Sequence, residues 1–200
     1  MFKQLRPALV IVLGMTLVTG LIYPLALTGV AQLLFPDQAN GSLLKRDGKV
    51  IGSALIGQNF TSARYFRGRP SATTDADPKD PTKQISAPYN AAASVGSNLG
   101  PTSKALADRV KEDVEKLRTQ GIEKPPVDLV TTSASGLDPH ISLMAALAQI
   151  PRIAKERKMT DAELRRLVER HIEGRTVGII GEPRVNVLKL NLALDALPPR

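Results

Sequence analysis

Apolar positions form one unbroken block at the start of the chain, and polar positions alternate with them only afterwards. From Pro7 to Pro36 there is no charged side chain, and the apolar run continues to Phe35. A helix of about 20 apolar residues crosses a hydrocarbon core of roughly 30 Å. The pattern therefore predicts a short N-terminus over residues 1–6 and a transmembrane helix over residues 7–35.

A cleaved signal peptide would begin in a similar way, and Gly29-Val30-Ala31 resembles a cleavage site. The hydrophobic region of a signal peptide spans about 7–15 residues, which is much shorter than this run. Pro24 would kink the helix, but membrane helices tolerate proline. We therefore favour an uncleaved anchor.

The orientation of the anchor follows from the flanking charges. Lys3 and Arg6 favour a cytoplasmic N-terminus, whereas Lys45, Arg46 and Lys49 weaken the bias from the other side. Long domains translocate largely regardless of their charge, and a first helix usually dominates. We expect residues 36–200 to form one soluble extracytoplasmic domain, in the periplasm of a bacterium.

Two small residues of the apolar block, Thr16 and Gly20, lie four positions apart and so on one helix face. Small residues at that spacing let a second helix approach closely. Glycine is also common in membrane helices for other reasons. Both a packing partner and ordinary composition explain the pair.

Beyond the anchor, the periodicity changes several times and predicts a mixed α/β (α+β) domain. Asp47-Gly48 is a strong turn signal and predicts a β-hairpin over residues 43–56. Residues 58–101 are rich in Pro, Ser, Thr, Asn and Gly but contain aromatics, which favours an ordered irregular segment, the loop lobe. A helix should follow, with the apolar stripe Leu106, Val110, Val114 and Leu117 and a stop at Gly121.

The C-terminal third should alternate short strands and helices. An extended segment is predicted over residues 125–132, then a helix over residues 141–150 capped by Asp138 and kinked or divided by Pro151. Thr160 opens another helix with a capping box; its apolar stripe runs to Ile172, and Gly174 ends it. Short strands are predicted over residues 177–180 and 185–187. The periodicity of residues 188–197 fits either a strand or a helix.

Composition narrows the classes of function. The 200 residues carry 27 Lys and Arg against 19 Asp and Glu, and the part after the anchor has a formal charge of 25 − 19 = +6. Aromatic residues make up only 4%, too few for a surface that stacks nucleic-acid bases. We expect no nucleic-acid partner, and interpret the scattered charges as a surface that meets lipid headgroups or an acidic partner. The absence of Cys excludes disulfides, thiolate metal sites and thiol nucleophiles.

A catalytic interpretation has one candidate cluster, formed by Ser133, Ser135, Asp138 and His140. Hydrolase triads gather their members from separate loops, and the Gly-x-Ser-x-Gly motif is missing. A turn followed by a helix cap explains the cluster better.

Metal and phosphate sites have weaker signals still. The chain has two His, and Asp75, Asp77 and Asp80 resemble an acidic loop that Pro78 and Pro81 interrupt, without a closing Glu. The phosphate-cradling glycine motif is absent. Gln149 stands among apolar residues, and we interpret it as an amide at the edge of the core, hydrogen-bonded to backbone.

Several ordered blocks resemble one known family, the C subunit of the Kdp potassium-transporting P-type ATPase. The resemblance runs nearly end to end. Small departures exist, since Leu143 stands where the family often has Pro and Ser103 where Asn is common. The blocks are residues 52–60, 65–66, 69–72, 89–90, 94–101, 127–131, 135–142, 149–154 and 181–188.

The resemblance implies a non-catalytic, single-pass subunit of the bacterial inner membrane. It implies three partners: a channel-like potassium-translocating subunit, a P-type ATPase subunit and a small one-helix subunit, with membrane lipid around them. It implies no cofactor of the chain's own, and ATP, magnesium and potassium at the level of the complex. Two roles are attached to the family: assembly of the complex, and a chaperone-like increase in the ATP affinity of the ATPase subunit.

The second role, an increase in ATP affinity, conflicts with an extracytoplasmic domain, because such a domain cannot touch ATP bound on the inside. Any effect on ATP affinity would have to cross the membrane as a coupling energy, for example through the helix. A direct contact of Gln149 with nucleotide would need the opposite topology, so we weight the outer-face assembly role above it. The predicted docking surface lies in the loop lobe and consists of Tyr65, Phe66, Arg69, Tyr89 and Asn98.

Two other functions remain as alternatives. An independent membrane-tethered binding domain would use the loop lobe as its pocket and would be stable alone. A tethered hydrolase would use Ser135 and His140, would lose activity on His140→Ala and would react with serine-directed probes.

Overall fold

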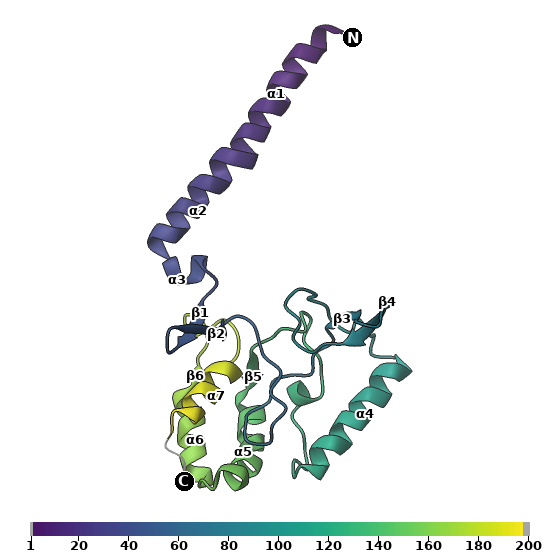
Figure 1. The fold of residues 1–200 in the computed structure, drawn as a ribbon, viewed down its shortest axis with the longest axis vertical. Helices are drawn as coiled ribbons and strands as arrows, with labels where there is room; N and C mark the ends of the chain where they lie inside the picture. The colour runs from purple at the N-terminus through teal and green to yellow at the C-terminus, as the bar shows by residue number, and fades with distance from the viewer. Residues whose placement is uncertain (1, 198–200) are drawn as a thin grey trace. The chain divides into compact units, whose positions relative to one another are not determined.

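The computed structural model describes residues 2–197, and its contacts group the chain into two compact units, Met1–Ser53 and Ala54–Arg200. Figure 1 shows the first unit as a long helix with a small hairpin, and the second as a body of helices and short strands. The prediction of a mixed helix and sheet fold is confirmed. The extracytoplasmic position of residues 36–200 stays a prediction.

The first unit begins with a continuous helical run. Residues 5–34 form 30 helical residues, and an 18-residue window within them has a mean hydropathy of 2.2, so the helix is long and apolar enough to cross a membrane. This run fits the helix predicted over residues 7–35. It consists of α1 (Leu5–Leu17), the π-helical turn η2 (Val18–Ile22) and α2 (Tyr23–Leu34), and the short 3₁₀ helix η1 (Phe2–Gln4) precedes it.

The π turn has a local cause in the sequence. Pro24 lacks an amide hydrogen and cannot bond the carbonyl of Gly20, four residues earlier. The residues just before Pro24 form one π-helical turn, in which the Tyr23 amide donates to the carbonyl of Val18, five residues earlier. A Cβ placed on Gly20 would lie 4.0 Å from Cγ2 of Thr16, so these two residues share a face. Their packing against another helix stays a prediction.

A short helix and a hairpin complete the first unit: α3 (Pro36–Ala39), β1 (Leu43–Arg46) and the antiparallel β2 (Lys49–Ser53). The predicted turn is confirmed, because Asp47 and Gly48 both adopt positive φ, 52° and 76°. The second strand ends at Ser53, earlier than the predicted limit of residue 56.

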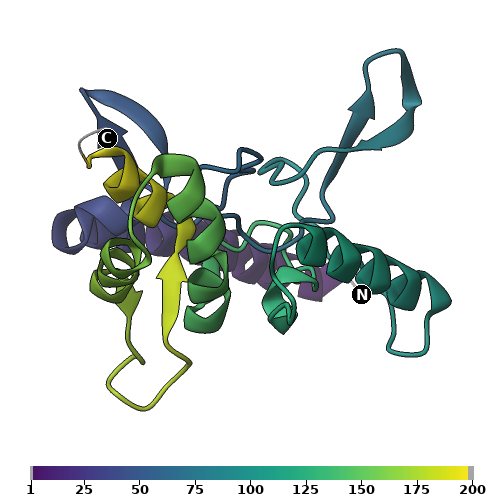
Figure 2. The same ribbon diagram turned by 90° about the horizontal axis from the view of Figure 1, so that it is seen from below.

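The core of the second unit lies among three helices and a small sheet. The helices are α5 (Leu143–Arg157), α6 (Asp161–Arg170) and α7 (Val187–Asp195). The antiparallel sheet has the order β5 (His140–Ser142), β7 (Arg184–Asn186), β6 (Ile172–Glu173). Figure 2 shows β7 running between the helices. The fully buried large apolar side chains include Phe66, Ile141, Ile153, Leu164, Val168, Val185, Leu190 and Leu194.

The start of α5 corrects the sequence analysis. Asp138 was expected to cap a helix beginning at residue 141, but residues 140–142 pair with β7 as a strand. The N-cap is Ser142, whose hydroxyl accepts a hydrogen bond from the amide of Ala145 at 3.0 Å. Pro151 lies inside α5, which continues undivided to Arg157. Edge pairing with a strand more than 40 residues away overrides the local capping signal.

Three further predictions in the C-terminal third were wrong or displaced. The segment 125–132, expected to be extended, contains the 3₁₀ helix η3 (Val127–Leu129). Ile172 belongs to strand β6 rather than to α6. Residues 177–180 form a turn closed by an isolated bridge between Thr176 and Ile180, and not a strand. The undecided tail is the helix α7.

The loop lobe, residues 58–101, is mostly irregular as predicted, but it also contains a hairpin that the sequence analysis missed. The hairpin pairs β3 (Thr74–Asp77) with β4 (Asp80–Ser86). Pro78 and Pro81 hide its signal, since proline in a strand pattern argues against a strand. The helix α4 (Lys104–Thr119) follows and, as predicted, stops before Gly121, which has a φ of 88°.

The capping box at the start of α6 yields a stability prediction. The Thr160 hydroxyl accepts from the Glu163 amide at 3.3 Å, and the Glu163 carboxylate accepts from the Thr160 amide at 2.9 Å. We expect Thr160→Ala to lower the free energy of unfolding by about 1 kcal/mol, because an orphan helix amide loses its acceptor. Urea unfolding of the full chain in detergent, followed by circular dichroism, measures this.

The matched control is Ser103→Ala at the N-cap of α4, where no side-chain hydrogen bond caps the helix. We expect a change below about 0.5 kcal/mol there. Equal losses in the two variants would contradict the assigned role of the Thr160 cap.

Candidate functional site

Two buried side-chain amides hold the loop lobe against the helices. Asn191 of α7 accepts from the Phe66 amide at 2.9 Å and donates to the Phe66 carbonyl at 2.8 Å. Gln149 of α5 does the same for the next residue, accepting from the Arg67 amide at 2.8 Å and donating to the Arg67 carbonyl at 3.1 Å. The prediction that Gln149 is a core-edge amide bonded to backbone is confirmed. Asn191 and Gln149 are called the amide clamp below.

An arginine extends the clamp along the lobe. The Arg152 guanidinium donates to the carbonyls of Ala63 and Tyr65 and to Oε1 of Gln149, the last at 2.8 Å. Burial, together with the nearby charge of Arg67, lowers the pKa of Arg152 to about 10. All three acceptors are neutral oxygens, so the positive charge of Arg152 is not cancelled by a direct carboxylate contact.

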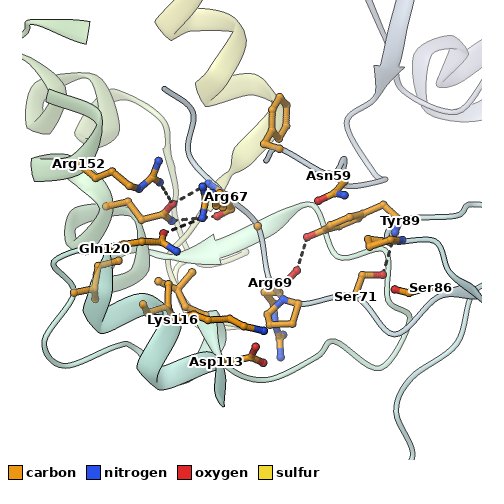
Figure 3. A pocket seen from close by; sticks show the side chains of 18 residues that line it. Asn59, Arg67, Arg69, Ser71, Ser86, Tyr89, Asp113, Lys116, Gln120 and Arg152 are labelled. Carbon is orange, nitrogen blue, oxygen red and sulfur yellow. Dashed lines mark hydrogen bonds between the residues drawn. The ribbon is translucent and has the colours of Figure 1, made fainter. Parts of the chain in front are cut away.

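A pocket of about 470 Å³ opens where the lobe meets α4 and α5 (Figure 3). Its lining carries four cations, Arg67, Arg69, Lys116 and Arg152, and one carboxylate, Asp113. Arg67 is held by a hydrogen bond to Oε1 of Gln120 at 2.8 Å. Since cations outnumber carboxylates, the pocket suits an anionic group better than a cation or an apolar ligand.

Tyr89 forms one wall of this pocket (Figure 3). Its hydroxyl donates to the Arg69 carbonyl at 2.7 Å, and its ring lies against Gly57 and Gly68, where a Cβ would clash. Its backbone has a φ of 63°, uncommon for a non-glycine residue. Burial, reinforced by the charge of Asp138, raises the pKa of Tyr89 to about 12.

A chain of charged and titratable side chains leads from the pocket to the sheet. Arg69 pairs with Asp138 at 3.2 Å, and His140 lies between two carboxylates, 3.6 Å from Asp138 and 3.2 Å from Glu173. Lys189 pairs with Glu173 at 3.0 Å. Burial by itself acts to raise the pKa of both carboxyls. At Asp138, the hydrogen bonds from His140 and the charge and hydrogen bond of Arg69 outweigh burial and lower the pKa. At Glu173, the hydrogen bond and charge of Lys189 are the main cause of a lowered pKa.

The candidate hydrolase cluster does not have the geometry of a triad. Both ring nitrogens of His140 face carboxylates, and within residues 2–197 no hydrogen bond joins His140 to a serine. The Ser135 hydroxyl accepts from the Leu137 amide at 3.1 Å, and Ser133 is buried. A nucleophile and its base need to be within hydrogen-bond reach. These residues therefore serve a turn and an ion-pair chain.

The acidic residues of the lobe likewise serve the β3–β4 hairpin. Their carboxylates accept from nearby backbone amides, Asp75 from Ala76, Asp77 from Lys79 and Asp80 from Thr82. In the part of the chain that the structure describes, no three His, Asp or Glu side chains gather as a metal site.

The five predicted docking residues do not share one surface. Phe66 is buried in the core, and Tyr65 lies half-buried under Arg157, with its hydroxyl donating to Asp195 at 3.0 Å. Arg69 and Tyr89 line the basic pocket, and only Asn98 is exposed. Docking through these residues stays a prediction.

Sequence reasoning missed several residues that build the site. Arg67 and Arg152 escaped notice because an arginine in a loop or on a helix carries no local signal of its partners. Asn191 did have a signal, since it interrupts the apolar run of α7 just as Gln149 interrupts that of α5.

A 30-residue apolar helix joined to a folded unit with a basic pocket indicates a class of protein: a membrane-associated subunit or binding module. The profile of the family described as "KdpC: K+-transporting ATPase, c chain" matches residues 5–196. The chain belongs to the KdpC family, and is thus a subunit of a potassium-transporting ATPase.

Similar proteins cover nearly the whole chain. A protein of Rhodopseudomonas palustris is 63% identical over 197 residues, which is 98% of this chain and 99% of its own length. Proteins of Bradyrhizobium diazoefficiens and Methylobacterium nodulans are 63% and 65% identical, each over 98% of both chains. All three are named "Potassium-transporting ATPase KdpC subunit".

The amide clamp predicts a large effect of one substitution. We expect Gln149→Leu to lower the free energy of unfolding by about 3 kcal/mol or more, because the buried amide and carbonyl of Arg67 each lose a partner. Urea unfolding of the full chain measures the change. As a control, Gln120→Leu removes only a half-buried acceptor of Arg67 and should cost clearly less; a similar loss in both would contradict the clamp.

The buried phenol of Tyr89 predicts a pH dependence. The pKa of a tyrosine in the unfolded chain is about 10, and the fold raises the pKa of Tyr89 to about 12. Between these values the unfolded chain releases a proton that the fold retains, so stability should fall as pH rises from about 10 to about 12. The urea concentration at the midpoint of unfolding should fall with rising pH less steeply in Tyr89→Phe than in the wild-type chain. An unchanged slope in Tyr89→Phe would contradict the assignment.

Proposed function

We propose that this chain is a non-catalytic accessory subunit of the ATP-driven, high-affinity potassium uptake complex Kdp. It stabilises the assembly of the potassium-translocating and ATPase subunits from the outer face of the inner membrane, with its N-terminus in the cytoplasm. The observation that carries this proposal is that polar side chains of the second unit bond to other parts of that unit. Arg67, Arg152, the buried amide of Gln149 and His140 contact other parts of the same unit, and in the described part of the chain these side chains are not arranged as nucleophile and base.

The proposed partners are a channel-like potassium-translocating subunit, a P-type ATPase subunit and a small one-helix subunit, within membrane lipid. The family is that of an ATPase complex, and ATP, magnesium and potassium are then bound by those partners. The long apolar helix supports this arrangement, because it gives the chain a surface inside the bilayer for contact with neighbouring helices.

We propose further that any increase in ATP affinity is indirect. Gln149 offers no free polar atom to a nucleotide: its oxygen accepts from Arg67 and Arg152, and its nitrogen donates to Arg67 and Ala145. The coupling would then pass through the helix face that carries Thr16 and Gly20.

A second candidate function is an independent, membrane-tethered binding domain. The basic pocket favours it, since about 470 Å³ is within the size range of small-ligand sites. This candidate predicts a lone, stable chain that binds a small anion.

Purification of the tagged full chain from its own membranes in mild detergent separates the two. We expect a P-type ATPase subunit and a channel-like subunit to co-purify, with ATPase activity that potassium stimulates. Complexes prepared without the chain should be less stable and show a higher KM for ATP. A stable chain recovered alone, without ATPase activity, would contradict the subunit role and favour the binding domain.

A further inference from the structure

An apolar loop projects from the sheet of the second unit. It connects β6 to β7, and Figure 2 shows it extending away from the helices. Its tip carries three aliphatic side chains, Val177, Ile179 and Ile180, which are 83%, 76% and 66% exposed. Scattered single apolar residues are ordinary on a surface, but three within four positions of one projecting loop are not.

The loop is held in one shape rather than left open. The amide of Thr176 donates to the carbonyl of Ile180 at 2.8 Å, and the amide of Ile180 donates back at 3.0 Å. Arg175 and Glu182 close the base with two hydrogen bonds of 3.0 and 3.1 Å. Val177 has a φ of 54°, a conformation that a β-branched residue rarely adopts. A strained, exposed and pre-shaped apolar tip has the properties of an interface anchor.

We propose that the tip formed by Val177, Ile179 and Ile180 inserts into an apolar recess of another subunit of the same transporter. This inference rests on the proposed function as a subunit and adds the surface that makes the contact. A few residues that fill well-packed, desolvated pockets on the partner carry most of the affinity of protein interfaces.

Two observations favour a protein over the bilayer as the occupant. Segments that lie in the membrane interface are typically rich in aromatic residues and in unpaired Lys or Arg. The tip has neither, since its residues are Val, Gly and Ile, and the flanking Arg175 is paired with Glu182. The charges at the base therefore give no net attraction to anionic headgroups.

The small size of the tip favours a subunit of the same complex over a free partner or a second copy. A stable interface between independent proteins buries about 800 Å² on each side, more than three side chains supply. A chain already held in a complex by its membrane helix binds its second contact at a high effective concentration. A small anchor is then sufficient.

The test compares variants of the full chain in co-purification from native membranes. Complete burial of each aliphatic side chain is worth about tenfold in affinity, so V177S/I179S/I180S should weaken retention of the other subunits by about a thousandfold. Ile179→Ser alone should show part of this loss. The matched control is Val127→Ser on η3, an aliphatic side chain that is 73% exposed and should have no effect.

A photo-crosslinker in place of Ile179 identifies the occupant directly and does not depend on the stability of the serine variants. We expect an adduct with another subunit of the transporter. A lipid adduct, an adduct with a second copy, or wild-type retention of the triple variant would overturn the inference. Failure of the wild-type chain to co-purify with any subunit would instead overturn the proposed function.

Discussion

The second unit depends on one constraint: an irregular segment must have its peptide groups satisfied where it crosses a core made of helices. Buried backbone amides and carbonyls without partners cost about 1–3 kcal/mol each. At Phe66 and Arg67 no strand is available to pair with the chain, so the side chains of Asn191 and Gln149 supply all four bonds. This clamp is what allows a segment with little regular structure to be ordered.

The site follows from the clamp. Once Phe66 and Arg67 are fixed, Arg67 and Arg69 line the pocket together with Arg152, which hydrogen bonds to Gln149 and to lobe carbonyls hold in place. Arg67 and Arg152 are held by neutral oxygens, whereas Arg69 pairs with Asp138 and Lys116 pairs with Glu112. The pocket thus keeps its positive excess at Arg67 and Arg152, while the contacts through Asp138, His140 and Glu173 join it to the sheet.

Local chemistry predicted some elements well. The apolar helix, the Asp47-Gly48 turn, α4 and the capping box of Thr160 were all found from sequence, because each is specified by residues within a few positions of one another. The interpretation of Gln149 succeeded for a similar reason, since an amide inside an apolar stripe has to find partners. The β3–β4 hairpin was missed because its prolines argue locally against strands.

The sequence by itself determined the long apolar helix, the Asp47-Gly48 turn, the Thr160 capping box and the resemblance to a family. Tertiary structure decided where α5 begins, because pairing of residues 140–142 with β7 made Ser142 the cap in place of Asp138. It also decided which predicted site residues are accessible, burying Phe66 and leaving Asn98 exposed. The physical reason is range: caps and turns are set by neighbouring residues, whereas strand pairing, burial and the pocket need groups from distant segments to meet.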